Sequence, residues 1–177
     1  MKHKSSSTIS EPSEVKEPEL LTIGVYGYDE DTFFGALAAH HVDVFCDIRA
    51  RRGVRGRLYT FANSAYLQNR LKAMGIRYLH LKELAPSKRN RTLQDEDDKA
   101  RHIPKRKRTK LGSAFIETYQ QEVLSTLDAS DFLRAIGPDA NVVALFCVEH
   151  HPEACHRSLL AEKLGDELNL TVRHIVL

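Results

Sequence analysis

The sequence predicts an α/β fold in three layers, with helices on both faces of a mostly parallel sheet of about five strands. Short apolar runs alternate along the chain with longer stretches of helical periodicity, which is the order expected of strand–helix–strand units. The runs are apolar at consecutive rather than alternate positions, as is typical of strands covered on both faces. A length of 177 residues with 42% hydrophobic content suits one globular domain.

Five apolar runs are predicted as strands, and each has the length of an ordinary strand. They cover residues 20–26, 42–48, 76–81, 141–148 and 171–177. The predicted helices have apolar residues three and four positions apart. They cover residues 31–40, 63–75, 113–127, 131–137 and 155–168. Asp31 or Thr32 is expected to cap the first helix. Asn63 or Ser64 is expected to cap the second, and Gly75 to end it.

The sequence also predicts the bounds of the folded domain and the cellular compartment of the protein. Residues 1–19 combine Ser, Pro, Glu and Lys with few apolar side chains, so they bury too little surface to offset the entropy of ordering. We expect a disordered tail over 1–19 and a single domain over 20–177. The N-terminus lacks the apolar stretch of a signal peptide, and no apolar run approaches the ~18 residues of a membrane span. A cytoplasmic protein without a membrane partner is therefore expected.

Positive charge is concentrated in residues 86–112, which hold ten Lys or Arg against four acids. This segment has no apolar periodicity, so it is predicted to be an extended or mobile basic loop inserted into the domain. Its cluster Arg106, Lys107 and Arg108 suits attraction to a phosphate backbone. The alternative is a solvent-exposed surface loop whose acids, residues 95–98, form ion pairs within the segment. Because the segment lacks aromatic residues, any nucleic-acid contact should be sensitive to salt and indifferent to sequence.

Polar residues follow the predicted strands, and in a parallel sheet those positions meet at one edge, where ligands bind. Asp47 and Arg49 lie two residues apart at the end of the second strand and so point to the same side. One interpretation makes Arg49 an anion ligand oriented by Asp47, because a guanidinium matches carboxylate and phosphate. The other is a salt bridge that orders the basic, Gly-containing loop 49–57.

The densest cluster of reactive side chains lies in residues 146–164, between the fourth strand and the last helix. Residues 152–155 are expected to begin that helix, and free N–H groups at a helix N-terminus favour an anion. Arg157 and Cys155 are therefore predicted ligand-binding residues. The alternative for Arg157 is a surface pair with Glu153 or Glu162.

Three roles compete for the thiols. Cys46, Cys147 and Cys155 are an odd number of cysteines, so a disulfide framework is not expected. Cys46 should be buried in the second strand. Cys147, at a strand end, is better placed than Cys155 to be a nucleophile with a lowered pKa. The spacing Cys-x7-Cys-His matches no common zinc pattern, and adjacent residues rarely share one metal, so neither metal nor cofactor is predicted. Simple packing of both thiols is the third role.

Two further residues complete the predicted catalytic set. Glu149 is a candidate general acid or base, or else an acceptor that orders the loop. His156 is a candidate for acid, base or nucleophilic work beside Cys147.

These residues carry a resemblance to a known family. The chain resembles the uncharacterised bacterial and archaeal family called domain of unknown function 488, DUF488, from about residue 21 to its end. The matching residues are Thr22, Ile23, Gly24; Asp47, Arg49; Gly75, Ile76, Tyr78; Cys147, Glu149, Pro152, Cys155, His156, Arg157; and Val172, His174, Ile175. Members usually carry Leu-Gly-Gly after the third strand, where this chain has Glu83, Leu84, Ala85 and Pro86. The resemblance implies a fold but no reaction. A weaker likeness to rhodanese-like domains is one of fold only.

Three hypotheses about function follow. The first is a protein that binds a phosphate- or carboxylate-bearing small molecule, such as a nucleotide, at the strand ends, whether or not it is an enzyme. The second is a nucleic-acid-associated protein that uses the basic loops 49–57 and 88–110. The third is a sensor that binds the same anion without turnover.

Overall fold

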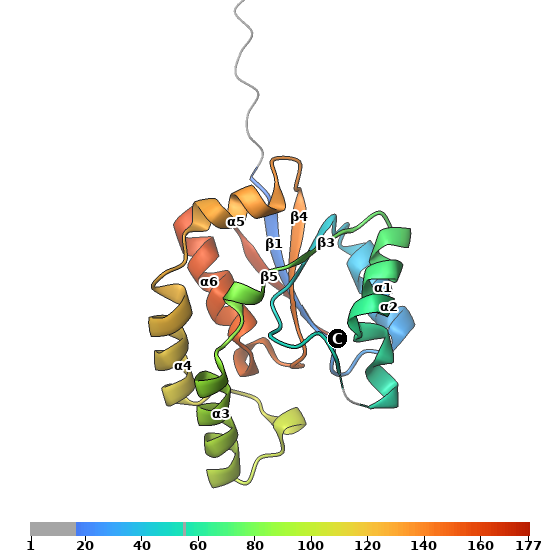
Figure 1. The fold of residues 1–177 in the computed structure, drawn as a ribbon. Helices are drawn as coiled ribbons and strands as arrows, with labels where there is room; N and C mark the ends of the chain where they lie inside the picture. Colours follow the sequence, from blue (N-terminus) through green and yellow to red (C-terminus); the bar gives the residue numbers. More distant parts are fainter. Residues whose placement is uncertain (1–16, 55) are drawn as a thin grey trace, which may run out of the picture.

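The computed structural model describes residues 17–54 and 56–177 (Figure 1). Its centre is a sheet of five strands in the order β3-β2-β4-β1-β5. Every pairing is parallel. The strands are β1 Glu19–Gly24, β2 Val44–Asp47, β3 Arg77–His80, β4 Val142–Cys147 and β5 Val172–Ile175. The predicted α/β class is confirmed. The predicted tail lies outside the described residues up to residue 16, and Glu19 already belongs to β1.

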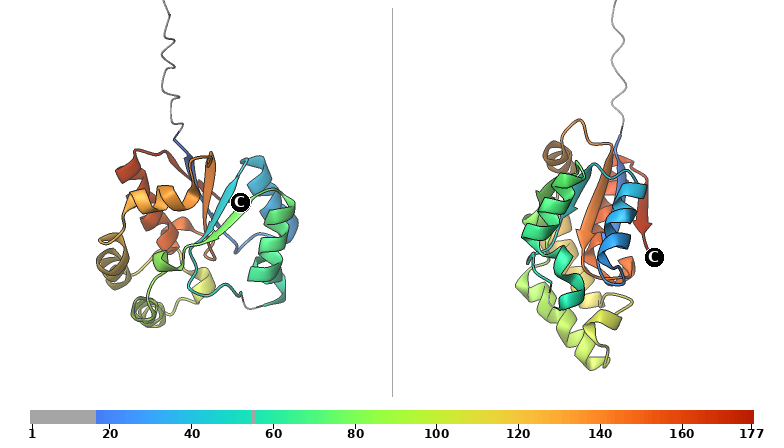
Figure 2. Two further views of the ribbon diagram at one scale, coloured as in Figure 1. Left: turned by 45° about the horizontal axis from the view of Figure 1, so that its top comes forward. Right: turned by 90° about the vertical axis from the view of Figure 1, so that its right-hand side faces the viewer.

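Helices cover both faces of the sheet (Figures 1 and 2). They are α1 Glu30–Ala39, α2 Ser64–Ala73, α3 Lys88–Ala100, α4 Ser113–Tyr119, α5 Ala129–Ile136 and α6 His156–Leu168. Short 3-10 segments are η1 Arg57–Ala62, η2 Lys82–Leu84, η3 Lys105–Lys107 and η5 Pro152–Ala154, and a π-helical turn, η4 Gln120–Leu124, continues α4. No helix in the described part of the chain combines the length and apolar character needed to cross a membrane.

The two faces of the sheet have separate cores. Phe45 and Phe146 pack with the helix residues Phe33 and Leu67 on the side of α1 and α2. Cys46 and Leu145, the neighbours of those phenylalanines in β2 and β4, pack against α4, α5 and α6 instead. Side chains of a strand alternate between its two faces. A strand covered on both faces must therefore be apolar at consecutive positions, as these runs are.

The helix boundaries show which predicted caps form. α1 is capped by Asp29, whose side chain accepts a hydrogen bond from the Thr32 backbone N–H while the Thr32 side chain accepts one from Asp29. The prediction of Asp31 or Thr32 as the cap was wrong, because this reciprocal capping box begins earlier. Gly75 follows α2 with a positive φ of 73°, which confirms it as the stop of that helix.

The basic segment 86–112 is not one extended loop, because α3 occupies its first half. The buried residues of α3 are Asn90, Gln94 and Asp98, which lie four apart and so share one helix face. This face is polar and makes hydrogen bonds to other parts of the chain, although the buried Asn90 Oδ1 has no hydrogen-bond partner among the described residues. The Asn90 side chain donates to the Phe115 carbonyl, and the Gln94 side chain accepts from the Gly112 N–H and donates to Asp98. Because its buried face is polar, this helix has no apolar periodicity by which the sequence could predict it.

The charged end of this face predicts a stability effect. The Asp98→Ala substitution is expected to lower the free energy of unfolding by about 2 kcal/mol. Asp98 and Arg108 form a buried ion pair of 2.8 Å, and the variant would leave Arg108 with Glu149 as its one carboxylate partner. Urea denaturation measures the change. Glu96→Ala, at an exposed position of the same helix, should leave the midpoint unchanged, and equal midpoints for both variants would contradict this account of α3.

Candidate functional site

A cleft of about 690 Å³ lies at the carboxyl ends of β2 and β4. Its walls come from the loop after β2, from α3, from the segment between α3 and α4, and from the turn between β4 and α6. Segments that are distant in sequence meet there because the strands that precede them are parallel neighbours, which is the site geometry expected of this fold class.

The cleft is strongly cationic. Among the described residues, seven Lys and Arg side chains line it against two acids. The cations are Arg49, Arg51, Lys88, Arg91, Lys105, Arg106 and Arg108, and the acids are Asp95 and Glu149. Arg51, Lys88 and Lys105 are exposed to solvent. Such a concentration of positive charge attracts anions and raises their local concentration.

Asp47 and Arg49 form a buried, two-pronged ion pair. The Arg49 Nε and Nη2 donate to the two carboxylate oxygens at 2.8 and 2.7 Å, and Nη1 donates to the Ala62 carbonyl at 3.0 Å. Asp47 also accepts a hydrogen bond of 2.8 Å from the Tyr78 hydroxyl. The salt bridge that orders the loop therefore forms, and it orients an arginine that lines the cleft.

Arg157 is fully buried at 0% exposure and pairs with neither Glu153 nor Glu162. Its Nη1 donates to the Glu149 carbonyl at 2.6 Å and its Nη2 to the His150 carbonyl at 2.9 Å. It does not line the cleft. Arg157 thus holds the turn that follows β4. This role occupies its two Nη groups, whereas its buried Nε has no hydrogen-bond partner among the described residues.

The cluster Arg106, Lys107 and Arg108 does not act as one surface. Arg108 is buried between two carboxylates, donating to Asp98 and Glu149 at 2.8 Å each. Arg108 was predicted to contact a phosphate backbone from a basic loop, whereas in the structure two acids hold it inside the molecule. Lys107 is exposed, and the Arg106 guanidinium lies over the Tyr26 and Tyr59 rings at 5.3 and 5.6 Å.

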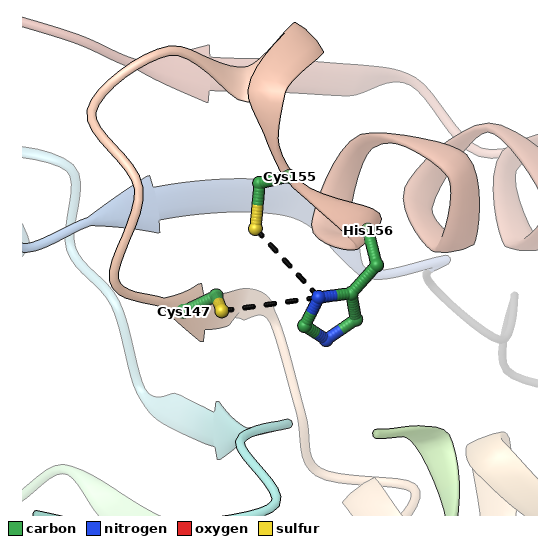
Figure 3. A group of neighbouring side chains, drawn as sticks. All are labelled: Cys147, Cys155 and His156. Carbon is green, nitrogen blue, oxygen red and sulfur yellow. Dashed lines mark hydrogen bonds between the residues drawn. The ribbon is translucent and has the colours of Figure 1, made fainter. Parts of the chain in front are cut away.

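Cys147, Cys155 and His156 converge (Figure 3), and as buried residues of its lining they form the floor of the cleft. The His156 Nδ1 lies 3.9 Å from the Cys147 Sγ and 3.8 Å from the Cys155 Sγ. All three side chains are buried. Cys147 ends β4, whereas the other two residues stand at the start of α6. The turn between them, held by Arg157, brings the two thiols together.

The hydrogen bonds of His156 settle its tautomer. Its Nε2 lies 3.2 Å from the Ile48 carbonyl, which can only accept, so Nε2 carries the proton and donates. When the ring is neutral, the lone pair of Nδ1 therefore faces the two sulfur atoms. The Tyr119 ring packs edge-on against this imidazole at 5.4 Å and restricts its rotation.

The pKa values of the two thiols are shifted in opposite directions. The hydrogen bond with Cys155, together with burial, raises the pKa of Cys147 well above its usual value. Burial opposes ionisation of Cys155 as well, but the hydrogen bond from Cys147 and the charges of His156 and Arg157 outweigh it and hold the pKa of Cys155 well below its usual value. The sequence interpretation favoured Cys147 as the nucleophile. In the structure Cys155, which stands at the start of α6, is the more acidic of the two thiols.

Glu149 lies in the same cleft and is 5% exposed. Burial raises the pKa of its carboxyl group to about 7, although the ion pair with Arg108 acts in the opposite direction. A carboxyl group that titrates near neutrality is suited to proton transfer. Glu149 thus sits with Cys147 and His156, as the sequence predicted for these three catalytic candidates.

The sequence reasoning missed the second wall of the cleft. Lys88 and Arg91 line it from α3, yet they were assigned only to a flexible basic loop. Two features of the sequence could have indicated this helix: polar residues spaced four apart in α3, and Ser87 as a helix cap before them. In the structure the Ser87 side chain caps α3 by accepting a hydrogen bond from the Asn90 N–H.

Comparison with known proteins identifies a family. The family model described as "Domain of unknown function DUF488" matches residues 30–164. No curated protein and no solved structure matches the chain. The chain belongs to the DUF488 family, as its sequence motifs indicated.

Proposed function

We propose that this member of the DUF488 family binds a phosphate- or carboxylate-bearing small molecule, with nucleotides among the candidates, in the cationic cleft. The observation that carries the proposal is the charge of the cleft, with seven Lys and Arg against two acids among its described lining residues. Arg49 and Arg108 are neutralised by buried carboxylates, so the attraction comes mainly from exposed side chains such as Arg51, Lys88 and Lys105.

The position of the cleft supports a reactive role for the same site. Cys147, Glu149 and His156 line the same cleft as the exposed cations that would attract the anion. A molecule anchored by its charged end would present its remaining atoms to a thiol, a carboxyl group and an imidazole, which are three of the commonest groups in acid, base and nucleophilic catalysis. Turnover of the bound molecule would distinguish an enzyme from a sensor.

A pair of aromatic residues, of which Tyr26 lines the cleft, favours a nucleotide among the anions. Tyr26 lines the cleft and lies 5.1 Å from Tyr59, measured between ring centroids. The Arg106 guanidinium covers both rings. Aromatic rings and guanidinium planes stack with bases, so a base could be accommodated beside the phosphate-binding side chains.

The charge of the cleft predicts which variants lose binding. The double substitution Arg51→Gln and Lys88→Gln is expected to weaken binding of pyrophosphate or a nucleotide about tenfold or more, without changing the unfolding midpoint, because both side chains are exposed. Isothermal titration calorimetry measures the affinity at two salt concentrations, and higher salt should weaken binding. The control removes the same charge at Lys72 and Lys82, which are exposed and do not line the cleft.

Equal affinities for the two double variants would contradict the proposed site. A short oligonucleotide in the same titration tests the nucleic-acid alternative. If the oligonucleotide alone bound, with an affinity that fell with salt and with Arg106→Gln and Lys107→Gln, the basic segment would be the functional surface.

A further inference from the structure

We propose that Cys147, Cys155 and His156 bind a zinc ion at the floor of the cleft, with a fourth coordination position open toward the bound anion. The metal site is independent of the proposed anion binding, whereas the use of its open position rests on that function. Two thiolates and one imidazole are the soft ligand set that selects zinc among the common divalent ions.

The distances fit a single ion. The three ligand atoms lie within 4.8 Å of one another, and His156 Nδ1 is 3.8 and 3.9 Å from the two sulfur atoms. Zinc binds sulfur at about 2.3 Å and nitrogen at about 2.0 Å, so two such ligands at a tetrahedral angle lie roughly 3.6 Å apart. The two nitrogen–sulfur distances would have to shorten by a few tenths of an ångström, and the two sulfur atoms, which lie within 4.8 Å of each other, would approach by up to about 1 Å to complete the site around an ion.

The imidazole is already oriented for this role. Because Nε2 donates to the Ile48 carbonyl, the proton is on the nitrogen that faces away from the sulfur atoms, and the lone pair of Nδ1 points between them (Figure 3). A hydrogen bond from the second ring nitrogen to a carbonyl is the usual support of a metal-bound histidine. Packing of two buried thiols requires no such orientation.

The backbone explains how adjacent residues can share one ion. Cys155 is extended, with φ −139° and ψ 142°, whereas His156 begins α6. Successive residues within a helix diverge around its axis, but this change of conformation between Cys155 and His156 lets both side chains point into the cleft. The sequence spacing alone argued against a zinc site because it does not show this junction.

The site has the composition of a catalytic rather than a structural zinc site. Structural sites have four protein ligands, whereas catalytic sites have three and keep one position for water or substrate. Within the described residues, the cluster that could hold a metal comprises these three side chains. Glu149 lines the same cleft but pairs with Arg108, so it would lie near the open position rather than occupy it.

Metal analysis of the purified protein tests the proposal directly. The full chain, purified without chelator and with reducing agent, is expected to contain equimolar zinc by inductively coupled plasma mass spectrometry. Cys155→Ala and His156→Ala should reduce the zinc to a trace. Cys46→Ala and His151→Ala are the matched controls, because Cys46 packs in the core and His151 is exposed in the turn before α6. Both controls should keep the full zinc content.

Cobalt substitution tests the geometry and does not depend on the stability of any variant. Wild-type protein loaded with Co²⁺ should show sulfur-to-metal charge-transfer bands and the strong visible bands of a tetrahedral site. Addition of pyrophosphate or a nucleotide should change the visible bands if the fourth position faces the anion. If calorimetry shows that the anion binds but the visible bands of the cobalt protein do not change, the open coordination position is wrong, and the metal site itself stands.

The failures of the two proposals are distinguishable. If reduced wild-type protein binds neither zinc nor cobalt stoichiometrically, or if thiol titration finds Cys147 and Cys155 joined in a disulfide, the metal site is overturned, whatever the anion titrations show. If zinc is bound and no anion binds, the proposed anion-binding function is wrong and the metal site stands.

Discussion

The Gly24→Ala variant is expected to lose about 4 kcal/mol of unfolding free energy. Gly24 ends β1, and a Cβ atom built there would overlap the Glu149 carbonyl oxygen and lie 2.9 Å from the Glu149 carbonyl carbon. It would also lie 3.0 Å from the Arg157 Nη1. The obstacle is backbone that Arg157 holds in place, so the methyl group can be accommodated only by moving the turn between β4 and α6.

The same substitution should disturb the site. The turn displaced by the new methyl group carries Glu149 and leads to Cys155 and His156, so binding of zinc and of anions should fall together with stability. Chemical denaturation with metal analysis measures both effects. The control is Gly35→Ala in α1, where a Cβ would meet nothing within 4 Å; this variant should be slightly more stable than wild type, because alanine favours a helix. A Gly24→Ala protein with wild-type stability would show that the turn is not tightly packed against β1.

The Arg157→Ala variant is also expected to lose about 4 kcal/mol of unfolding free energy. The substitution removes a fully buried side chain and leaves the Glu149 and His150 carbonyls without the guanidinium that donates to them. Urea denaturation measures the loss. Arg89→Ala, at an exposed arginine of α3, should change stability little.

Arg157→Lys separates packing from hydrogen bonding. Lysine keeps the charge but carries a compact ammonium group that lacks the planar fork of a guanidinium, so it cannot reproduce the two hydrogen bonds, and we expect an intermediate loss of stability. If Arg157→Ala instead folded with wild-type stability and lost only its affinity for anions, Arg157 would be the anion ligand that the sequence interpretation proposed.

The apolar runs of the sequence predicted the sheet and the edge at which the candidate site lies. The apolar runs around Phe45 and Phe146 identified the parallel sheet, because a strand buried on both faces must be apolar at consecutive positions. From the sheet followed the edge at which Asp47, Arg49 and Cys147 would lie, since all parallel strands end on the same side. The DUF488 motifs pointed to the same residues, and the family match agrees with them.

The helix α3 was not predicted from apolar periodicity. Its buried face is polar, so apolar periodicity was absent, and Asn90, Gln94 and Asp98 became recognisable as a buried face only through their partners. Those partners lie in other elements, among them Phe115, Gly112 and Arg108. Whether a polar side chain is buried depends on groups far away in the chain, which no local pattern describes.

The sequence alone therefore determined the fold class, the edge of the sheet that bears the candidate site, and the types of side chain gathered there. The tertiary structure decided what each side chain does. Two arginines expected to meet anions, Arg108 and Arg157, turned inward to carboxylates and carbonyls. Cys147, Cys155 and His156 converged through a turn and a change of backbone conformation. The reason is that hydrophobic periodicity is a local property of the chain, whereas burial, ion pairing and ligand geometry depend on residues brought together only by folding.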